Sequence, residues 1–332
     1  MKSFLKSVFR FLIIPIVIFL LLVIGYIVYD PFQVIHSYDK YTSLQVNRSY
    51  MSTEVFLKNY KKEHYNSFIF GSSRIFGYNV DSWKKHIVAD ASVYSFDSYG
   101  EKIEAVYHKL KFLDSLNVDI KNVLLCLDVD FTFNYNENEP KFLYMEHPLL
   151  SGKGWCDFHE THFSAYFTPS FIISFYGNRI LGLKNSYIGQ HYFLVQASFD
   201  PKTNRPFRSD LEERIKNEPD YHDAAMFYTV RDTLIVSQFI QIDKQHEETL
   251  RGIKQIFSKH NTNYKVVINP LYSQVKFNPQ DMDAIISVFG SEHVYDFSGR
   301  NEFTTSKYNY YEESHFRPFV GDSIMNIIYG KQ

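Results

Sequence analysis

Two short motifs at opposite ends of the chain carry residue types that could cleave an ester. The first is the run Gly71-Ser72-Ser73-Arg74, in which two hydroxyl side chains follow a glycine. The second is Glu312-x-x-His315, close to the C-terminus. A serine nucleophile needs a base within hydrogen-bond reach, and that base needs an acceptor on its other ring nitrogen. Together the two motifs supply these groups as Ser73, His315 and Glu312.

Taken alone, the serine turn has a structural interpretation. The apolar run 67–70 is typical of a buried strand, so Ser72 and Ser73 lie between a strand and a helix, where serine is a favoured N-cap. The catalytic interpretation places the turn at the carboxyl edge of a parallel sheet, where open α/β sheets bind ligands. Backbone N–H groups at such a turn can also stabilise an oxyanion. His315, with Glu312 beside it, favours the catalytic interpretation.

Asp128 and Asp130 directly follow a further apolar run, residues 122–127. Such an Asp-x-Asp sequence resembles the metal-binding motif of nucleotide-sugar glycosyltransferases, in which carboxylate oxygens hold a divalent ion. The motif is short and occurs often by chance, and a domain outside the cell has poor access to nucleotide sugars. A metal-dependent glycosyltransferase is therefore an alternative to the esterase and not the preferred function.

Two more groups of residues have both a functional and a structural interpretation. Cys156, His159 and His162 have a loose zinc-ligand spacing without an evident fourth ligand, so solvated loop residues are favoured and no metal or cofactor is expected. Arg74 and Arg317 are candidates for binding an anionic substrate group such as phosphate. The structural alternative for both arginines is ion pairing with carboxylates.

The elements around these motifs alternate between strands and helices. Strand patterns cover residues 67–70, 93–96, 122–127, 264–269 and 294–295, and helical patterns cover residues 101–116, 249–260, 279–289 and 321–329. This alternation predicts an α/β domain with a parallel sheet covered by helices on both faces. It stops between about residues 131 and 245, a stretch that we interpret as one long insertion.

Residues 11–29 form an apolar stretch without charge that is long enough to cross a bilayer as a helix. Lys2, Lys6 and Arg10 precede it and Asp30 follows it. The positive-inside rule then predicts a cell-membrane protein with a cytoplasmic N-terminus and an extracytoplasmic C-terminal domain. A cleaved signal peptide is the alternative, but its apolar region is shorter and a small-residue cleavage site follows it. We therefore expect a single-pass anchor in the lipid bilayer.

The composition excludes some classes of function. A net charge of -2 argues against nucleic acid as a partner, and two cysteines are too few for a disulfide framework. Cys126 lies in an apolar strand pattern, where a buried free thiol is expected. Aromatic residues make up 18% of the chain, as in a large core, a sugar-binding surface or a belt at a membrane interface.

These patterns divide the chain into three parts. Residues 1–30 form a cytoplasmic tip and a transmembrane helix, residues 31–64 a stalk or lead-in segment, and residues 65–332 the α/β domain with its insertion. Within the insertion, the aromatic segment 163–176 is too short to span a bilayer. It either lies flat at the membrane surface or packs as a helix on the domain.

Taken together, the motifs resemble those of the SGNH/GDSL hydrolases. The strand-Gly-Ser-Ser run at residues 68–74 resembles the first motif of that family, a strand followed by Gly-Asp-Ser, and Ser73 falls on the nucleophile. Residues 93–100 resemble the second motif, with Gly100 on its glycine. Glu312-x-x-His315 resembles the last motif, Asp-x-x-His. The resemblance covers about residues 65–130 and 246–332 and leaves the insertion unexplained.

The resemblance implies a flavodoxin-like parallel sheet, the SGNH fold, and a serine esterase or O-acyltransferase. The nearest likeness is to membrane-anchored members such as polysaccharide O-acetyltransferases and D-alanyl-lipoteichoic acid esterases. It implies a cell-envelope polysaccharide or polymer ester as substrate, and a membrane acyl-transfer partner. A non-catalytic envelope assembly protein on the same fold is the remaining alternative.

The resemblance also implies an oxyanion hole, formed by the backbone N–H groups of Ser73 and Gly100. The third motif of the family should add an asparagine donor. Asp130 lies nearest that position in this chain, and an ionised carboxylate cannot donate a hydrogen bond. Asn134 or Asn136 would then have to supply the missing donor.

Overall fold

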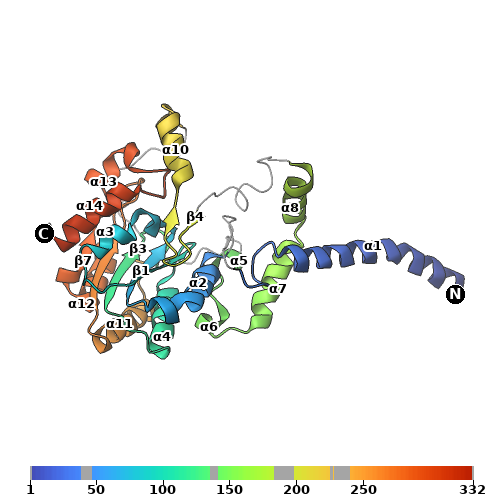
Figure 1. Ribbon diagram of the computed structural model, residues 1–332, viewed down its shortest axis with the longest axis horizontal. Coiled ribbons are helices and arrows are strands. Elements are labelled where there is room, and N and C mark those ends of the chain that lie inside the picture. The colour runs from blue at the N-terminus through green and yellow to red at the C-terminus, as the bar shows by residue number, and fades with distance from the viewer. Residues whose placement is uncertain are drawn as a thin grey trace. The chain divides into compact units, whose positions relative to one another are not determined.

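The computed structural model describes residues 2–38, 47–134, 141–182, 198–224, 227 and 240–330. The chain divides into two units, each made of segments that are far apart in the sequence. The first unit comprises Met1–Val46 and Gly154–Leu194, and the second comprises Asn47–Lys153 and Val195–Gln332. Figure 1 shows the elements of both units by label and colour.

The second unit is built on a parallel sheet with the strand order β2-β1-β3-β6-β7. All four neighbouring pairs are parallel. The strands are β1 (Ser67–Ser72), β2 (Val93–Ser98), β3 (Asn122–Leu127), β6 (Asn263–Ile268) and β7 (Val294–Asp296). Strand order reverses between β1 and β3, and ligands of doubly wound sheets bind at the carboxyl end of such a switch point. The predicted parallel sheet is confirmed.

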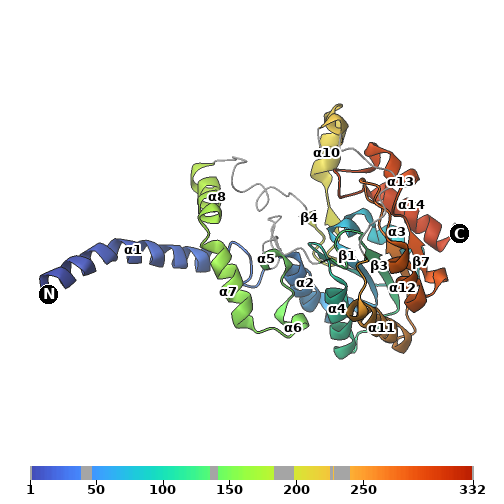
Figure 2. The same ribbon diagram turned by 180° about the vertical axis from the view of Figure 1, so that it is seen from behind.

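Helices cover both faces of the sheet, as predicted (Figures 1 and 2). Side chains of a strand alternate between its two faces, so Phe68 and Phe70 belong to one core and Ile69 to the other. The first core is closed by α2 (Arg48–Glu63), α4 (Ile103–Ser115), α11 (Lys244–Lys259) and α12 (Pro279–Phe289). The second core is closed by α3 (Val80–Lys84) and α14 (Pro318–Tyr329).

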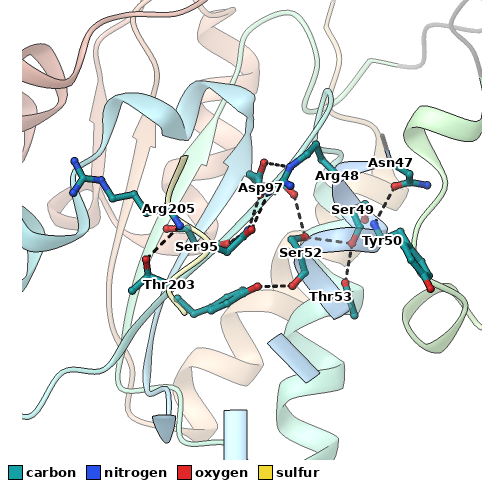
Figure 3. Close-up of polar contacts among 12 residues, drawn as sticks. Asn47, Arg48, Ser49, Tyr50, Ser52, Thr53, Ser95, Asp97, Thr203 and Arg205 are labelled. Atoms are coloured by element: carbon teal, nitrogen blue, oxygen red, sulfur yellow. Dashed lines mark hydrogen bonds and ion pairs between the residues drawn. The ribbon is translucent and has the colours of Figure 1, made fainter. Parts of the chain in front are cut away.

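Within residues 31–64, expected to be a stalk or lead-in segment, residues 48–63 are helix α2 of the α/β unit. Its Phe56 is completely buried in the first core. At the start of α2, the guanidinium of Arg48 donates to both carboxylate oxygens of Asp97 at 2.8 and 2.7 Å and to Asn204 at 2.9 Å (Figure 3). The segment has a polar sequence because polar side chains such as Arg48 form buried hydrogen bonds to the sheet.

Residues 131–245, expected to form one long insertion, lie between β3 and α11 and are divided between the two units. Helices α7 (Trp155–Tyr166) and α8 (Pro169–Leu181) belong to the first unit. The α/β unit keeps α5 (Lys141–Tyr144), α6 (Pro148–Ser151), the antiparallel pair β4 (Ser198–Phe199) and β5 (Pro206–Phe207), and α10 (Ser209–Asn217). Its remaining short elements are η1 (Ser73–Gly77), η2 (Tyr221–Asp223), η4 (Ser291–His293), α13 (Glu302–Thr305) and η5 (Lys307–Asn309).

The first unit contains α1 (Lys2–Tyr29), in which Arg10–Tyr29 is long and apolar enough to cross a membrane. This 20-residue stretch has a mean hydropathy of 3.2. At 1.5 Å per residue it is about 30 Å long, which matches the hydrocarbon thickness of a bilayer. Most of its side chains from Phe11 to Leu21 are exposed within the protein, as expected of a helix that contacts lipid.

Candidate active site

Ser73 lies at the carboxyl end of β1, at the edge of the sheet where the strand order reverses. Close packing explains the glycine before it: a Cβ on Gly71 would lie 2.6 Å from the side chain of Ile75 and 3.0 Å from Cys126. Ser72 is the N-cap of η1, and its hydroxyl accepts a hydrogen bond from the backbone N–H of Arg74 at 3.2 Å. The capping role therefore falls to Ser72, and Ser73 is left with its hydroxyl available for another partner.

That partner is His315, which the structure brings within hydrogen-bond reach from the other end of the chain. Ser73 Oγ lies 2.7 Å from His315 Nε2. On the other side of the ring, His315 Nδ1 is hydrogen bonded to the Glu312 carboxylate. Because an ionised carboxylate only accepts, Nδ1 carries the proton and Nε2 is free to accept the proton of the Ser73 hydroxyl. The three residues thus form the connected arrangement that a serine nucleophile needs.

Internal hydrogen bonds hold the loop that carries Glu312 and His315, just before α14. The backbone N–H of Tyr311 donates to the carbonyl of His315 at 2.9 Å. The second carboxylate oxygen of Glu312 accepts from the backbone N–H of Ser314 at 2.8 Å. The carboxylate is therefore fixed by its own loop, and it fixes the orientation of the imidazole in turn.

The environment of Glu312 favours its ionised form. Burial by itself would raise its pKa, but the positive charge that His315 can carry, the hydrogen bond from His315 and that from Ser314 outweigh burial. The pKa of Glu312 is lowered to about 2 as a result. The acceptor next to the imidazole is thus a carboxylate at neutral pH.

Arg74 is buried, which contradicts the prediction that it binds an anionic substrate group. Its Nη2 donates to Asp130 at 2.8 Å, and its Nη1 lies 3.3 Å from Asp128. Its Nε donates to the carbonyl of Ser314 at 2.9 Å, in the loop of His315. Burial opposes the charge of Arg74, but the two aspartates outweigh it and raise the guanidinium pKa. Structural ion pairing, the alternative, is what the structure shows, and it links the serine turn to the histidine loop.

Replacement of Arg74 by methionine is expected to lower the free energy of unfolding by about 3–5 kcal/mol, because it leaves the buried Asp128 without a countercharge. The midpoint of denaturant unfolding measures this effect. Arg317→Met is the matched control, since Arg317 pairs with Glu212 near the surface, and it should cost less than about 1 kcal/mol. Adding Asp128→Asn to Arg74→Met should recover part of the loss. Equal losses in the two single variants would contradict this assignment.

Arg317 is likewise engaged in the protein. Its Nη2 donates to Glu212 at 2.6 Å, and its Nε donates to the same carboxylate at 3.1 Å. The hydroxyl of Tyr311 donates to Glu212 at 2.7 Å. The ion-pairing alternative thus describes Arg317 as well, and the prediction that it binds substrate receives no support from these contacts.

The Asp-x-Asp sequence after β3 faces the guanidinium of Arg74. Both carboxylate oxygens of Asp130 accept from Arg74, and Asp128 accepts from the side-chain amide of Asn269 at 2.8 Å. A cation at this position would meet the positive charge of Arg74, so the arrangement argues against the glycosyltransferase alternative. It also means that the charge of Asp130, which would repel an oxyanion, is neutralised by an ion pair.

Gly100 lies at the same edge of the sheet as the serine turn, because Ser98 pairs with Ser72 in the register of β2 and β1. Its φ of +49° is a left-handed conformation that favours glycine. The next residue, Glu101, forms a buried ion pair with Lys109 at 2.7 Å. Burial raises the pKa of Glu101 to about 7, although Lys109 opposes the shift. This pair fixes the turn, and the role of Gly100 in an oxyanion hole stays a prediction.

The two asparagines that were expected to replace the missing donor have different outcomes. Asn134 is exposed, and its backbone N–H donates to the carbonyl of Phe131. Asn136 lies outside the described residues. Asn269, which sequence reasoning did not select, lies at the carboxyl end of β6 and contacts Asp128 and the hydroxyl of Tyr78. Its position between a strand and Pro270 was the signal that could have identified it.

Sequence reasoning also missed an aromatic wall beside the imidazole, formed by Phe76 and Phe199. The ring of Phe76 stacks on His315 with centroids 5.8 Å apart, and the ring of Phe199 lies edge-on to Phe76 at 6.2 Å. The guanidinium of Arg48, which Figure 3 shows beside Asp97, lies 3.6 Å from the centroid of Phe199. Phe76 could have been selected from the sequence, because it follows Ser73 by three residues. Phe199 could not, because it lies in the segment interpreted as an insertion.

The Cys156, His159 and His162 group lies on helix α7 and not in a loop, so the expectation of solvated loop residues is wrong. His162 is buried, and its Nδ1 lies 2.8 Å from the carbonyl of Phe158, to which it donates. Across the ranges that the structure describes, no group of three or more His, Cys, Asp or Glu side chains is arranged to hold a metal ion. Cys126 is a buried free thiol, as expected.

The chain matches no protein-family model and no curated protein sequence.

Proposed function

We propose that the α/β unit is an SGNH-like serine esterase or O-acyltransferase. The observation that carries the proposal is the connected arrangement of Ser73, His315 and Glu312, with Ser73 Oγ 2.7 Å from His315 Nε2. The motif order supports the SGNH assignment, since Ser73 follows the first strand and His315 precedes the last helix. The strand order of the sheet is also that of doubly wound folds with a ligand site at this edge.

The reaction follows from the positions of the protons. Ser73 Oγ attacks the ester carbonyl while His315 Nε2 takes its proton, which gives a tetrahedral intermediate and then an acyl-enzyme. His315 returns that proton to the departing alkoxide. Backbone N–H groups of Ser73 and Gly100 would stabilise the negative oxygen. Attack by water on the acyl-serine completes an esterase cycle, whereas attack by a sugar hydroxyl completes an acyl transfer.

The substrate we propose is an acyl ester of a cell-envelope glycan or polymer. Helix α1 supports this proposal, because an anchored enzyme keeps its site within reach of surface-bound material. The basic residues Lys2, Lys6 and Arg10 before the apolar stretch support a cytoplasmic N-terminus and an extracytoplasmic α/β unit in the cell membrane. An acyl-transfer partner in the same membrane would supply acyl groups if the enzyme is a transferase.

Covalent labelling tests the proposed nucleophile directly. A fluorophosphonate probe should label the full chain in detergent, and peptide mass spectrometry should place the adduct on Ser73, because the probe traps a serine that a neighbouring base activates. Protein unfolded in denaturant before exposure to the probe is the control and should not be labelled. An adduct on a different residue, or no adduct on the folded protein, would sink the assignment.

A further inference from the structure

Helices α7 and α8 pack on the C-terminal half of α1 (Figures 1 and 2). Burial along α1 begins at Leu22, while the preceding half of its apolar stretch stays exposed. Aromatic pairs join α1 to α7 and α8, with ring centroids 5.3 Å apart for Phe19 and Phe167 and 5.3 Å apart for Tyr26 and Phe163. The aromatic segment is thus neither isolated nor a part of the α/β unit, and its packing partner is the candidate membrane helix.

Two tyrosine hydroxyls at this interface are hydrogen bonded within the first unit, whereas the buried hydroxyl of Tyr26 has no hydrogen-bond partner among the described residues. The hydroxyl of Tyr166 donates to the carbonyl of Leu22 at 3.0 Å and lies 2.7 Å from the hydroxyl of Tyr176. Gly25 makes this approach possible, because a Cβ there would collide with the Tyr176 hydroxyl. A small residue at a close helix contact is typical of helix packing in an apolar surrounding.

The turn that follows α1 is held by hydrogen bonds within the first unit. The carboxylate of Asp30 is buried and accepts from the backbone N–H groups of Val34, Ile35 and His36, each at 2.9 Å. The Tyr38 hydroxyl donates to it as well, at 3.0 Å. Irregular backbone close to the hydrocarbon region must satisfy its polar groups internally, and this turn does so.

The position along α1 gives the depth. Arg10 marks one end of the apolar stretch and Tyr29 the other. Phe19 is about 15 Å from Tyr29 along the helix axis, which is about half the thickness of the hydrocarbon core. The ring of Phe167 packs on Phe19, whereas Phe171 at the start of α8 packs on Phe32, just beyond the apolar stretch. The turn between α7 and α8 therefore lies beside the half of the apolar stretch that ends at Tyr29.

The charged residues of α7 and α8 lie away from the turn between the two helices. Residues 161–177, which include the turn, contain no Asp, Glu, Lys or Arg. The charged side chains lie toward the outer ends, with Asp157 and Glu160 early in α7 and Arg179 late in α8. The guanidinium of Arg179 lies 4.6 Å from the ring centroid of Tyr29, at the end of the apolar stretch. Aromatic rings and arginine at that level are typical of the membrane interface.

We infer that α7 and α8 contact the leaflet in which α1 ends, with their turn at residues 167–169 in the hydrocarbon beside α1. The partner of this surface is the lipid bilayer. The inference rests on the proposed anchoring by α1 and adds a second membrane contact that the helix itself does not imply. The anchor would then be one helix that crosses the bilayer and two helices that contact the leaflet in which it ends.

Site-directed spin labelling of the full chain in lipid vesicles tests the inference. A nitroxide is attached at residue 168 in a Thr168→Cys, Cys156→Ser variant, and its collisions with oxygen and with a water-soluble nickel chelate are compared. Oxygen concentrates in hydrocarbon and the chelate in water, so a high ratio of oxygen to nickel collisions is expected at residue 168. The matched control is the native Cys156, which is exposed at the start of α7 and should give a low ratio.

A third label separates the inference from the anchoring on which it rests. Ile16→Cys in the Cys156→Ser background reports on α1 itself, because Ile16 is exposed and precedes the contact of Phe19 with Phe167. A high ratio at residue 16 with a low ratio at residue 168 would overturn the insertion and leave the anchor in place. Low ratios at both positions would overturn the anchor itself. High ratios at residues 16 and 168, with a low ratio at Cys156, are the result that we expect.

Discussion

Replacement of Ser73 by alanine is expected to lower kcat for hydrolysis of an activated acetyl ester by about 10⁴- to 10⁶-fold. The hydroxyl of Ser73 is the group within hydrogen-bond reach of His315 Nε2, and without it no acyl-enzyme can form. The residual rate would come from binding and the oxyanion donors alone. Steady-state kinetics of the purified full chain in detergent measures the loss, and KM is expected to change little.

Ser72→Ala is the matched control, because Ser72 offers the same hydroxyl one residue earlier. Its hydroxyl caps η1, so the variant should lose about 1 kcal/mol of stability and keep most of its activity. Full activity in Ser73→Ala with loss in Ser72→Ala would move the nucleophile to Ser72. Loss of cellular function in neither variant would favour a non-catalytic assembly protein on the same fold.

Glu312→Gln is expected to lower kcat by about 10⁴-fold while leaving the fold intact. A glutamine amide can donate to His315 Nδ1, and this would stabilise the tautomer in which Nε2 carries the proton and cannot act as a base. The rate should therefore fall even though the side chain keeps its shape. Kinetics with the same ester measures the effect, and Glu302→Gln, at an exposed carboxylate on α13, is the control that should stay near the wild-type rate.

The lowered pKa of Glu312 predicts how the stability of the protein changes at acidic pH. The pKa of Glu312 is lowered to about 2 in the folded protein, against about 4.3 in an unfolded chain. Its contribution to stability is therefore complete above pH of about 4.3 and is lost as the pH falls toward about 2. This component should vanish in Glu312→Gln, so the variant should lose less stability than the wild type over that interval. Unfolding curves at several pH values would contradict the assignment if the two proteins lost stability equally.

The sequence predicted the sheet and the proximity of Ser73, His315 and Glu312 because both depend on local patterns. Each strand of the sheet is a short apolar run, and an apolar run reports burial without knowledge of its neighbours. Ser73 and His315 could be paired in advance because parallel strands place their carboxyl ends at one edge, so a residue after the first strand meets a loop near the last. The expected pairing of the two motifs needed no information about any individual contact.

The errors arose where a side chain's role depends on distant partners. Arg74 looked like a substrate-binding group because nothing in its neighbourhood along the chain reveals Asp128 and Asp130, which lie at the end of another strand. Arg48 made α2 look like a stalk, because its partners Asp97 and Asn204 come from two other parts of the chain. In both cases a charged side chain is buried because it forms an ion pair with residues that are distant in the sequence.

The division of residues 131–245 could not be predicted for a related reason. The aromatic residues of α7 and α8 predict that these helices have apolar faces. Periodicity does not show which other element covers an apolar face. The cover is α1, more than a hundred residues earlier in the chain. The fold of the first unit is therefore a property of two segments together.

This discontinuous arrangement affects how a soluble form of the protein should be designed. Removing residues 1–46 to eliminate the hydrophobic N-terminus would take away the surface on which α7 and α8 pack. Phe171 and Phe175, which are now buried, would be uncovered together with Tyr166, and an apolar patch of this kind promotes aggregation. A well-behaved secreted version would need residues 154–194 to be excised as well and replaced by a short polar linker between Lys153 and Val195.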